Sequence, residues 1–253
     1  MPPRCYRELQ GVLDGARRLI EGEQAFLPNR TERRFTVACT DVTCAILIPR
    51  LTAAFRQRLP NARLRVMTVE DLNAAGYSES DVDLFVGVEE GLPAGCETEV
   101  LFEDPMVLIV RSGHPITRRR MSVQDYARLS HLEVEVGKRR DDAIDQHLAT
   151  RGLSRRIAMT VPYYTAVPAV VAATDLVATT TLGIATTFNH FQIRVLEPPF
   201  ELPSVVLRYV WHRRVAEDPG VAFLRSLIRQ TLANFPKTLA TRAGRHRRAT
   251  RSA

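Results

Sequence analysis

The stretch FTVACTDVTCAILIPRL, from Phe35 to Leu51, decides how the chain is expected to fold. It begins with residues typical of a strand and continues into a helix, on which Leu47 and Leu51 share one apolar face with Phe55 and Leu59. Small polar side chains occupy the joint. A strand that runs directly into a helix is the repeating unit of α/β proteins, so the rest of the chain should show the same alternation.

The alternation continues to residue 235. Strands are predicted at 34–39, 63–69, 82–88, 106–111, 131–136, 157–161, 176–180, 193–197 and 205–211, and helices at 44–59, 122–129, 142–151, 165–173 and 219–235. The last helix has Asp218 as its predicted N-cap and Pro219 at its first position. Gly152 is expected to end the helix at 142–151 in a left-handed conformation. The pattern predicts an α/β architecture with largely parallel sheets.

Two clusters of proline and glycine suggest that the chain passes twice between two lobes. They are RSGHPITRRR at 111–120 and LEPPFELPS at 196–204. The first lobe is therefore expected to comprise residues 35–111 and 201–236, and the second lobe residues 112–200. A cleft between two lobes joined by two strands is typical of a hinged ligand site.

Composition limits the class of protein. The 253 residues include 45% hydrophobic residues, and no apolar run approaches the ~18 residues of a membrane span. The charged N-terminus does not resemble a secretory signal, so the chain is expected in the cytoplasm and not at a membrane. Cys5, Cys39, Cys44 and Cys96 form no C-x-x-C pair, and no histidines lie at zinc-ligand spacing, so no metal is expected.

Most of the net positive charge lies in the last residues. The segment 237–253 contains six basic residues and no acidic one, whereas the whole chain has a formal net charge of +7. The preceding residues are therefore almost neutral. The composition predicts a disordered basic tail, which either holds phosphates loosely or is only a solvated extension.

Several segments, in this order, carry a resemblance to a known family. They are RRFTVACTD, LIPRLTAAFRQRLPNARLRV, DVDLFVG, LFEDPMVLIVRSGHPI, AIDQHLATRGLSRRIAMTVPYYTAVPAVVAATDLVAT, LEPPFELP and WHRRVAEDPGVAFLRSLIR. Together they resemble the effector-binding part of LysR-type transcriptional regulators over roughly residues 5–236. RGLSRRIAMTVP, VVAATDLVAT and EPPFELP are most similar to the branch of nodulation regulators and regulators of aromatic-compound degradation.

The resemblance implies a fold, partners and a function. The fold is that of type 2 periplasmic-binding proteins, with two lobes, two mixed sheets flanked by helices and a hinged cleft. The function is to sense a small-molecule effector, with an aromatic carboxylate as the expected class, and to control transcription within a homodimer or tetramer. Residues 1–34 resemble part of the linker helix that follows the family's winged helix-turn-helix, so DNA contact is expected only through such a domain or weakly through the tail. The segment TTLGIATTF departs from the branch.

The polar joint after the first predicted strand is a candidate effector site. Ligands in α/β sheets collect beyond the carboxyl ends of strands, where free amides at a helix start favour an anion. The hydroxyls of Thr40 and Thr43 can add hydrogen bonds to a carboxylate. The alternative is that Asp41 or Thr43 only caps the helix.

Other candidate contacts come from the second lobe and the crossings. Tyr163 and Tyr164 lie at another strand-to-helix joint, where one of them can cover a flat ligand. Lys138 and Arg139 follow a strand and can meet an anion, or they are solvated loop charges. Arg111 and Phe200 are candidates by their position near the crossings. Trp211 is expected in the core or in the packing between the lobes, and not in contact with the ligand.

The sequence does not favour an enzyme. It contains no G-x-S-x-G, P-loop, G-x-G-x-x-G or H-E-x-x-H motif, and the six histidines are scattered. No catalytic residue and no cofactor are therefore expected. The alternative function is that of a solute-binding protein of a transporter, which would share the two-lobed fold. The absence of a signal peptide and the narrow apolar stripe at residues 5–20 count against it.

Overall fold

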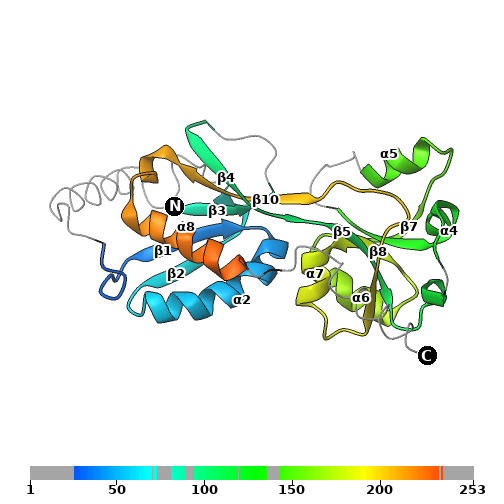
Figure 1. Cartoon of the computed structure of the whole chain (residues 1–253), viewed down its shortest axis with the longest axis horizontal. Helices are drawn as coiled ribbons and strands as arrows, with labels where there is room; N and C mark the ends of the chain where they lie inside the picture. Colours follow the sequence, from blue (N-terminus) through cyan, green and yellow to red (C-terminus); the bar gives the residue numbers. More distant parts are fainter. Residues whose placement is uncertain are drawn as a thin grey trace, which may run out of the picture.

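The computed structural model describes residues 26–69, 71–72, 81–88, 94–118, 120–135, 143–233 and 235. Figure 1 shows these residues arranged as two lobes along the long axis of the molecule, with strands passing between them. The predicted linker helix and the basic tail lie outside the described residues. No helix in the described ranges is long and apolar enough to cross a lipid bilayer.

The first lobe is built on one mixed sheet with the strand order β2-β1-β3-β10-β4. The strands β1, β2 and β3 are parallel, whereas β10 is antiparallel to both β3 and β4. Their bounds are β1 (Arg34–Cys39), β2 (Arg63–Met67), β3 (Leu84–Gly87), β4 (Cys96–Asp104) and β10 (Val205–His212).

The second lobe repeats this arrangement. A three-stranded sheet has the order β8-β5-β9, and β6 pairs with β7 in parallel. A parallel bridge between His131 and Val177 joins β6 to the residue before β8, so the combined order is β7-β6-β8-β5-β9. The bounds are β5 (Met106–Arg111), β6 (Ser130–Val134), β7 (Arg156–Val161), β8 (Ala178–Thr181) and β9 (Ile193–Leu196). Among the described residues, each sheet thus has three parallel strands, a fourth strand antiparallel to them, and a last strand antiparallel to the fourth.

The chain passes between the two sheets at Pro105 and again between β9 and β10. β4 ends at Asp104 in the first sheet, and β5 starts at Met106 in the second. The expectation that residues 106–111 belong to the first lobe, with the crossing at 111–120, differs from this arrangement. The proline and glycine there form a tight turn instead, with Gly113 at a φ of +85° before the 3-10 helix η1 (Pro115–Arg118).

Helices α2 (Asp41–Arg58) and α8 (Pro219–Leu232) pack against each other on the first sheet (Figure 1). Phe35 and Val37 of β1 share one core with the apolar faces of both helices. Each fully buried side chain of this size stabilises the fold by roughly 1.5–3 kcal/mol. As predicted, Asp218 caps α8, accepting the amide hydrogens of Gly220 and Val221 at 2.9 and 3.0 Å. Trp211 is buried in the same core, as predicted.

The second lobe carries α4 (Val123–Arg128), α5 (Ala143–Ala149), α6 (Val167–Ala173) and α7 (Leu182–Thr187), with the 3-10 helix η2 (Tyr164–Ala166) directly before α6. A third 3-10 helix, η3 (Arg213–Val215), follows β10. Gly152 ends the α5 segment at a φ of +65°, as predicted, and the amide of Leu153 donates to Leu148 at 3.0 Å. Neither β4 nor α7 was predicted from the sequence.

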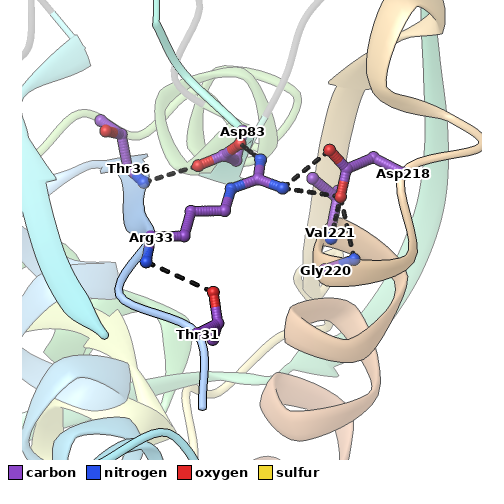
Figure 2. Close-up of polar contacts among 7 residues, drawn as sticks. All are labelled: Thr31, Arg33, Thr36, Asp83, Asp218, Gly220 and Val221. Atoms are coloured by element: carbon purple, nitrogen blue, oxygen red, sulfur yellow. Dashed lines mark hydrogen bonds and ion pairs between the residues drawn. The ribbon is translucent and has the colours of Figure 1, made fainter. Parts of the chain in front are cut away.

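Arg33 ties together three segments of the first lobe (Figure 2). Its guanidinium donates to both carboxylate oxygens of Asp218 at 2.7 Å and to Asp83 at 2.5 Å. Asp83 also accepts the amide hydrogen of Thr36 at 2.7 Å. One side chain therefore joins the start of β1, the approach to β3 and the start of α8.

Replacing Arg33 with Ala should lower the free energy of unfolding by about 2–4 kcal/mol. Removing one partner of a buried ion pair costs about 3–5 kcal/mol because the other charge stays buried and unpaired. The loss here should be somewhat smaller, since the Arg33 side chain is 30% exposed. Urea unfolding followed by circular dichroism measures the loss.

The neighbouring Arg34 provides the matched control. Its ion pair with Asp81 is exposed on both sides and spans 3.7 Å. Arg34→Ala should therefore change the free energy of unfolding by no more than about 0.5 kcal/mol. Equal losses for the two variants would contradict the role given to Arg33.

Candidate functional site

The joint between β1 and α2 has the predicted strand-to-helix geometry. Thr40 is the N-cap of α2, and its hydroxyl accepts the amide hydrogen of Thr43 at 3.3 Å. The two hydroxyls also lie 3.0 Å apart, within hydrogen-bond distance. The cap is thus Thr40, whereas Asp41 and Thr43 were the residues weighed as caps. The amides of Asp41 and Val42, at the first two helical positions, have no hydrogen-bond partner within the described residues.

Asp41 reaches across to the second lobe. Its Oδ2 accepts the amide hydrogen of Thr165 at 3.1 Å and lies 3.4 Å from the hydroxyl of the same residue. Thr165 belongs to η2, which leads directly into α6. The start of the first helix of lobe 1 therefore contacts the start of a helical segment of lobe 2.

The two predicted tyrosines directly precede Thr165 in the sequence. Tyr163 precedes η2 and is 60% exposed, whereas Tyr164 is the first residue of η2 and is half-buried. The structure thus brings the polar joint of β1 and α2 next to the segment that carries both tyrosines. The predicted site residues Thr40, Asp41, Thr43, Tyr163 and Tyr164 all lie at this junction between the lobes.

Two other predicted residues lie elsewhere. Arg111 is at the far end of β5, where its Nε donates to Asp175 at 2.6 Å, because β5 runs the length of the second sheet after the crossing. Phe200 packs inside the second lobe, stacked on His147 with ring centroids 4.2 Å apart and edge-on to Tyr126. Lys138 and Arg139 lie outside the described residues.

A second contact between the lobes was missed. The carboxylate of Asp104, at the end of β4, accepts the amide hydrogen of Gly183 in α7 at 2.9 Å. A side chain at position 183 would not fit, because its Cβ would lie 2.4 Å from Asp104 Oδ2. Asp104 is fully buried, and its Oδ2 has no hydrogen-bond partner among the described residues. In the sequence, Thr181 could have indicated the start of α7, because threonine is a common N-cap.

Burial has a direct electrostatic consequence at both ends of this junction. It raises the pKa of the Asp104 carboxyl, and hydrogen bonds from Thr181 and Gly183 oppose the shift. Burial also raises the pKa of the Cys39 thiol to about 12, and the neighbouring Cys44 thiol adds to the shift. Cys39 is therefore a neutral thiol at the base of the junction. The described residues contain no group of three or more side chains placed to hold a metal ion.

An open groove lies on the first lobe, away from this junction. Its walls come from β4 and the end of α8 and consist of Val100, Leu101, Phe102, Arg229, Leu232 and Ala233. These side chains are mostly apolar, and none of the predicted site residues is among them. The junction, with its facing helix starts, has the chemistry expected of a site for a polar ligand.

Comparison with known proteins identifies the family. The model of the LysR substrate binding domain matches residues 28–233. The chain belongs to the LysR family. The HTH-type transcriptional activator NahR of Pseudomonas putida is 27% identical over 221 residues, which cover 86% of this chain and 73% of NahR. Nodulation protein D 1 of a Bradyrhizobium species is 26% identical, over 90% of this chain and 73% of that protein.

Solved structures show the same fold. The probable transcriptional regulator PA0477 of Pseudomonas aeruginosa superposes with a TM-score of 0.70 at 26% identity, over 90% of this chain and 78% of that one. The BenM effector binding domain with its effector benzoate has a TM-score of 0.64 at 15% identity, over 83% and 97% of the two chains. The LysR domain therefore has the two-lobed fold of LysR effector-binding domains, which is periplasmic-binding-protein-like, as predicted.

The family also decides between the two functions that the sequence left open. The relatives of this LysR domain are transcriptional regulators, and its structural neighbours include effector-binding domains. Its role is thus ligand sensing in transcription regulation, and delivery of a solute to a transporter is not supported.

Replacing Asp104 with Asn should make the stability of the LysR domain less dependent on pH. Because burial raises the pKa of Asp104, the folded protein holds this proton more tightly than the unfolded chain does. The wild-type free energy of unfolding should therefore contain a term that decreases as the pH rises from about 4, the usual Asp pKa, through the raised folded-state pKa. Urea unfolding at several pH values measures this term as the difference between wild type and variant.

The exposed Asp71 provides the control for the pH series. Asp71→Asn makes the same change of a carboxylate to an amide on an exposed side chain, and it should leave the pH dependence of the free energy of unfolding unchanged. The same pH dependence in wild type and Asp104→Asn would contradict the raised pKa.

Proposed function

We propose that this LysR domain senses a small aromatic carboxylate at the junction between its lobes and changes the arrangement of the lobes in response. The observation that carries the proposal is the start of α2, where two amides without partners among the described residues lie close to the Thr40 and Thr43 hydroxyls, and where Asp41 contacts Thr165 of η2. Such a helix start favours an anion.

The class of effector has two supports. The half-buried Tyr164 and the exposed Tyr163 directly precede Thr165, which contacts α2, and a tyrosine ring stacks well on a flat ligand. BenM, which shares the fold, has benzoate as its effector. Benzoate and its uncharged analogue benzamide are therefore suitable probes.

In the complete regulator, the domain acts together with a DNA-binding domain. NahR is an HTH-type transcriptional activator, and we expect this chain likewise to act in the cytoplasm through a helix-turn-helix. The domain itself catalyses no reaction in this proposal. Its ligand acts by favouring one arrangement of lobes and subunits over another.

Benzoate should raise the melting temperature of the domain, and Thr43→Val should weaken benzoate more than benzamide. A ligand at about 100 times its Kd stabilises the folded state by about 2.7 kcal/mol, which a thermal-shift assay detects. Loss of a hydrogen bond to a charged group costs about 1.5–3 kcal/mol, so Thr43→Val should lower benzoate affinity by about tenfold or more. Titration calorimetry with both probes measures the difference.

Thr52 is the matched control, because it lies on the exposed side of the same helix and bonds only to Ile48 within the described residues. Thr52→Val should leave both affinities unchanged. Equal losses of benzoate and benzamide in Thr43→Val would refute a carboxylate at the start of α2. A screen in which only aliphatic or cationic compounds bind would refute the aromatic class.

The domain should also self-associate. The edge strands β2 and β7 expose Val66 and Met159, which are 37% and 41% accessible, and exposed apolar side chains on sheet edges are typical of subunit contacts. Closed two-fold contacts are the usual arrangement in homo-oligomers. Light scattering of the chain at micromolar concentration should give at least a dimer. A strict monomer would contradict signalling between subunits.

A further inference from the structure

The carboxylate of Asp41 contacts the second lobe. Asp41 lies in the first turn of α2, yet its carboxylate is hydrogen-bonded to Thr165 of the other lobe, 124 positions away in the sequence. Among the described residues, Asp41 takes part in no ion pair. Its carboxylate contributes a hydrogen bond to the contact between the lobes.

The start of α2 does not need Asp41 as its cap. The first turn of α2 is capped by Thr40. On the other side, Tyr163 precedes η2 without a side-chain hydrogen bond to cap it, and within the described residues the Thr165 amide has its acceptor across the junction. The Asp41–Thr165 contact thus satisfies a backbone amide of lobe 2 with a carboxylate of lobe 1. It exists only while the two helix starts are held together.

We propose that the Asp41–Thr165 contact makes lobe closure sensitive to the charge of the effector. This inference rests on the proposed effector position at the start of α2. A carboxylate bound to the free amides of Asp41 and Val42 lies beside the Asp41 carboxylate, and like charges at such distances repel. The bound anion therefore weakens the hydrogen bond to Thr165, and the lobes change their relative position. A neutral ligand of the same shape leaves the contact intact.

Asp41 then has two opposite effects on an anionic effector. Its charge lowers the affinity, because binding must overcome the repulsion. The same repulsion transmits the presence of the ligand to the second lobe, because the coupling between two sites is reciprocal. Removing the charge should increase anion affinity and abolish the response of the lobes.

The contact itself can be tested without any ligand, by hydrogen–deuterium exchange of the segment 163–167. The amides of Ala166 and Val167 bond inside the segment, so the Thr165 amide is the one whose acceptor lies in the other lobe. Asp41→Ala should accelerate exchange of the Thr165 amide by about tenfold or more. Asp125→Asn is the matched control: Asp125 also lies in the first turn of a helix, α4, and its change should leave the segment 163–167 unaffected.

The charge dependence is tested with benzoate and benzamide. In the wild type, benzoate should accelerate exchange of the Thr165 amide, and benzamide should not. Asp41→Asn keeps an oxygen that can accept the Thr165 amide hydrogen but removes the charge. It should raise benzoate affinity by about tenfold, leave benzamide affinity unchanged and abolish the effect of benzoate on exchange.

The outcomes separate this inference from the proposed function. Unchanged exchange in ligand-free Asp41→Ala would overturn the contact, and weaker benzoate binding by Asp41→Asn would overturn the repulsion, while both leave an aromatic-acid sensor standing. Faster exchange in Asp41→Ala, together with no benzoate binding to any form, would support the contact and overturn the proposed effector class. Faster exchange and tighter benzoate binding together support both.

Discussion

The double crossing of the chain between its two sheets is the constraint on which the rest of the structure depends. The chain leaves the first sheet after β4 and enters the second sheet as β5, which precedes the other strands of lobe 2. After β9 it returns to the first sheet as β10, which pairs between β3 and β4. Within the described residues, the chain therefore joins the lobes at Pro105 and at residues 197–204. Their relative position must be fixed by side chains at the junction, and such an arrangement is typical of hinged ligand sites.

Two carboxylates of lobe 1 supply hydrogen bonds to lobe 2, beside the packing of α2 on α7, and they differ in burial and position. Asp104 is fully buried close to the first crossing and bonds to Gly183, so it moves little when the lobes rotate about that crossing. Asp41 is half-buried at the start of α2 and bonds to Thr165. The first contact is suited to a fixed point of the hinge, and the second is suited to opening and closing.

Much of this architecture follows from local sequence. The strand and helix around Phe35–Leu51, the cap at Asp218 and the left-handed Gly152 are determined by residues close in the chain, and each was predictable. β4 was not, because Glu97, Glu99 and Glu103 interrupt its apolar residues, as an edge strand allows. The first crossing was predicted at 111–120, later in the chain than its actual place at Pro105. Proline and glycine occur in any turn, and the turn at Gly113 has both Gly113 and Pro115, whereas the crossing has Pro105 alone.

The candidate site shows the same limit more sharply. That polar residues follow β1, and that tyrosines precede α6, can be read from the sequence. The hydrogen bond between Asp41 and Thr165 cannot be read from the sequence, because it joins residues 124 positions apart and depends on how the lobes meet. Arg111 and Phe200 illustrate the opposite case: their positions near the predicted crossings suggested a cleft, whereas β5 carries Arg111 to the far end of lobe 2 and aromatic packing holds Phe200 inside it.

The size of the Asp41 interaction suits a sensor. A hydrogen bond to a charged group contributes about 1.5–3 kcal/mol, which favours the closed arrangement by about 10- to 150-fold. An effector can shift this equilibrium only by the difference between its affinities for the two arrangements. Interlobe contacts worth many times this amount would lock the domain against any small ligand, and much weaker contacts would leave no closed state to disturb. A single carboxylate on a single amide lies within the range that one bound anion can overcome.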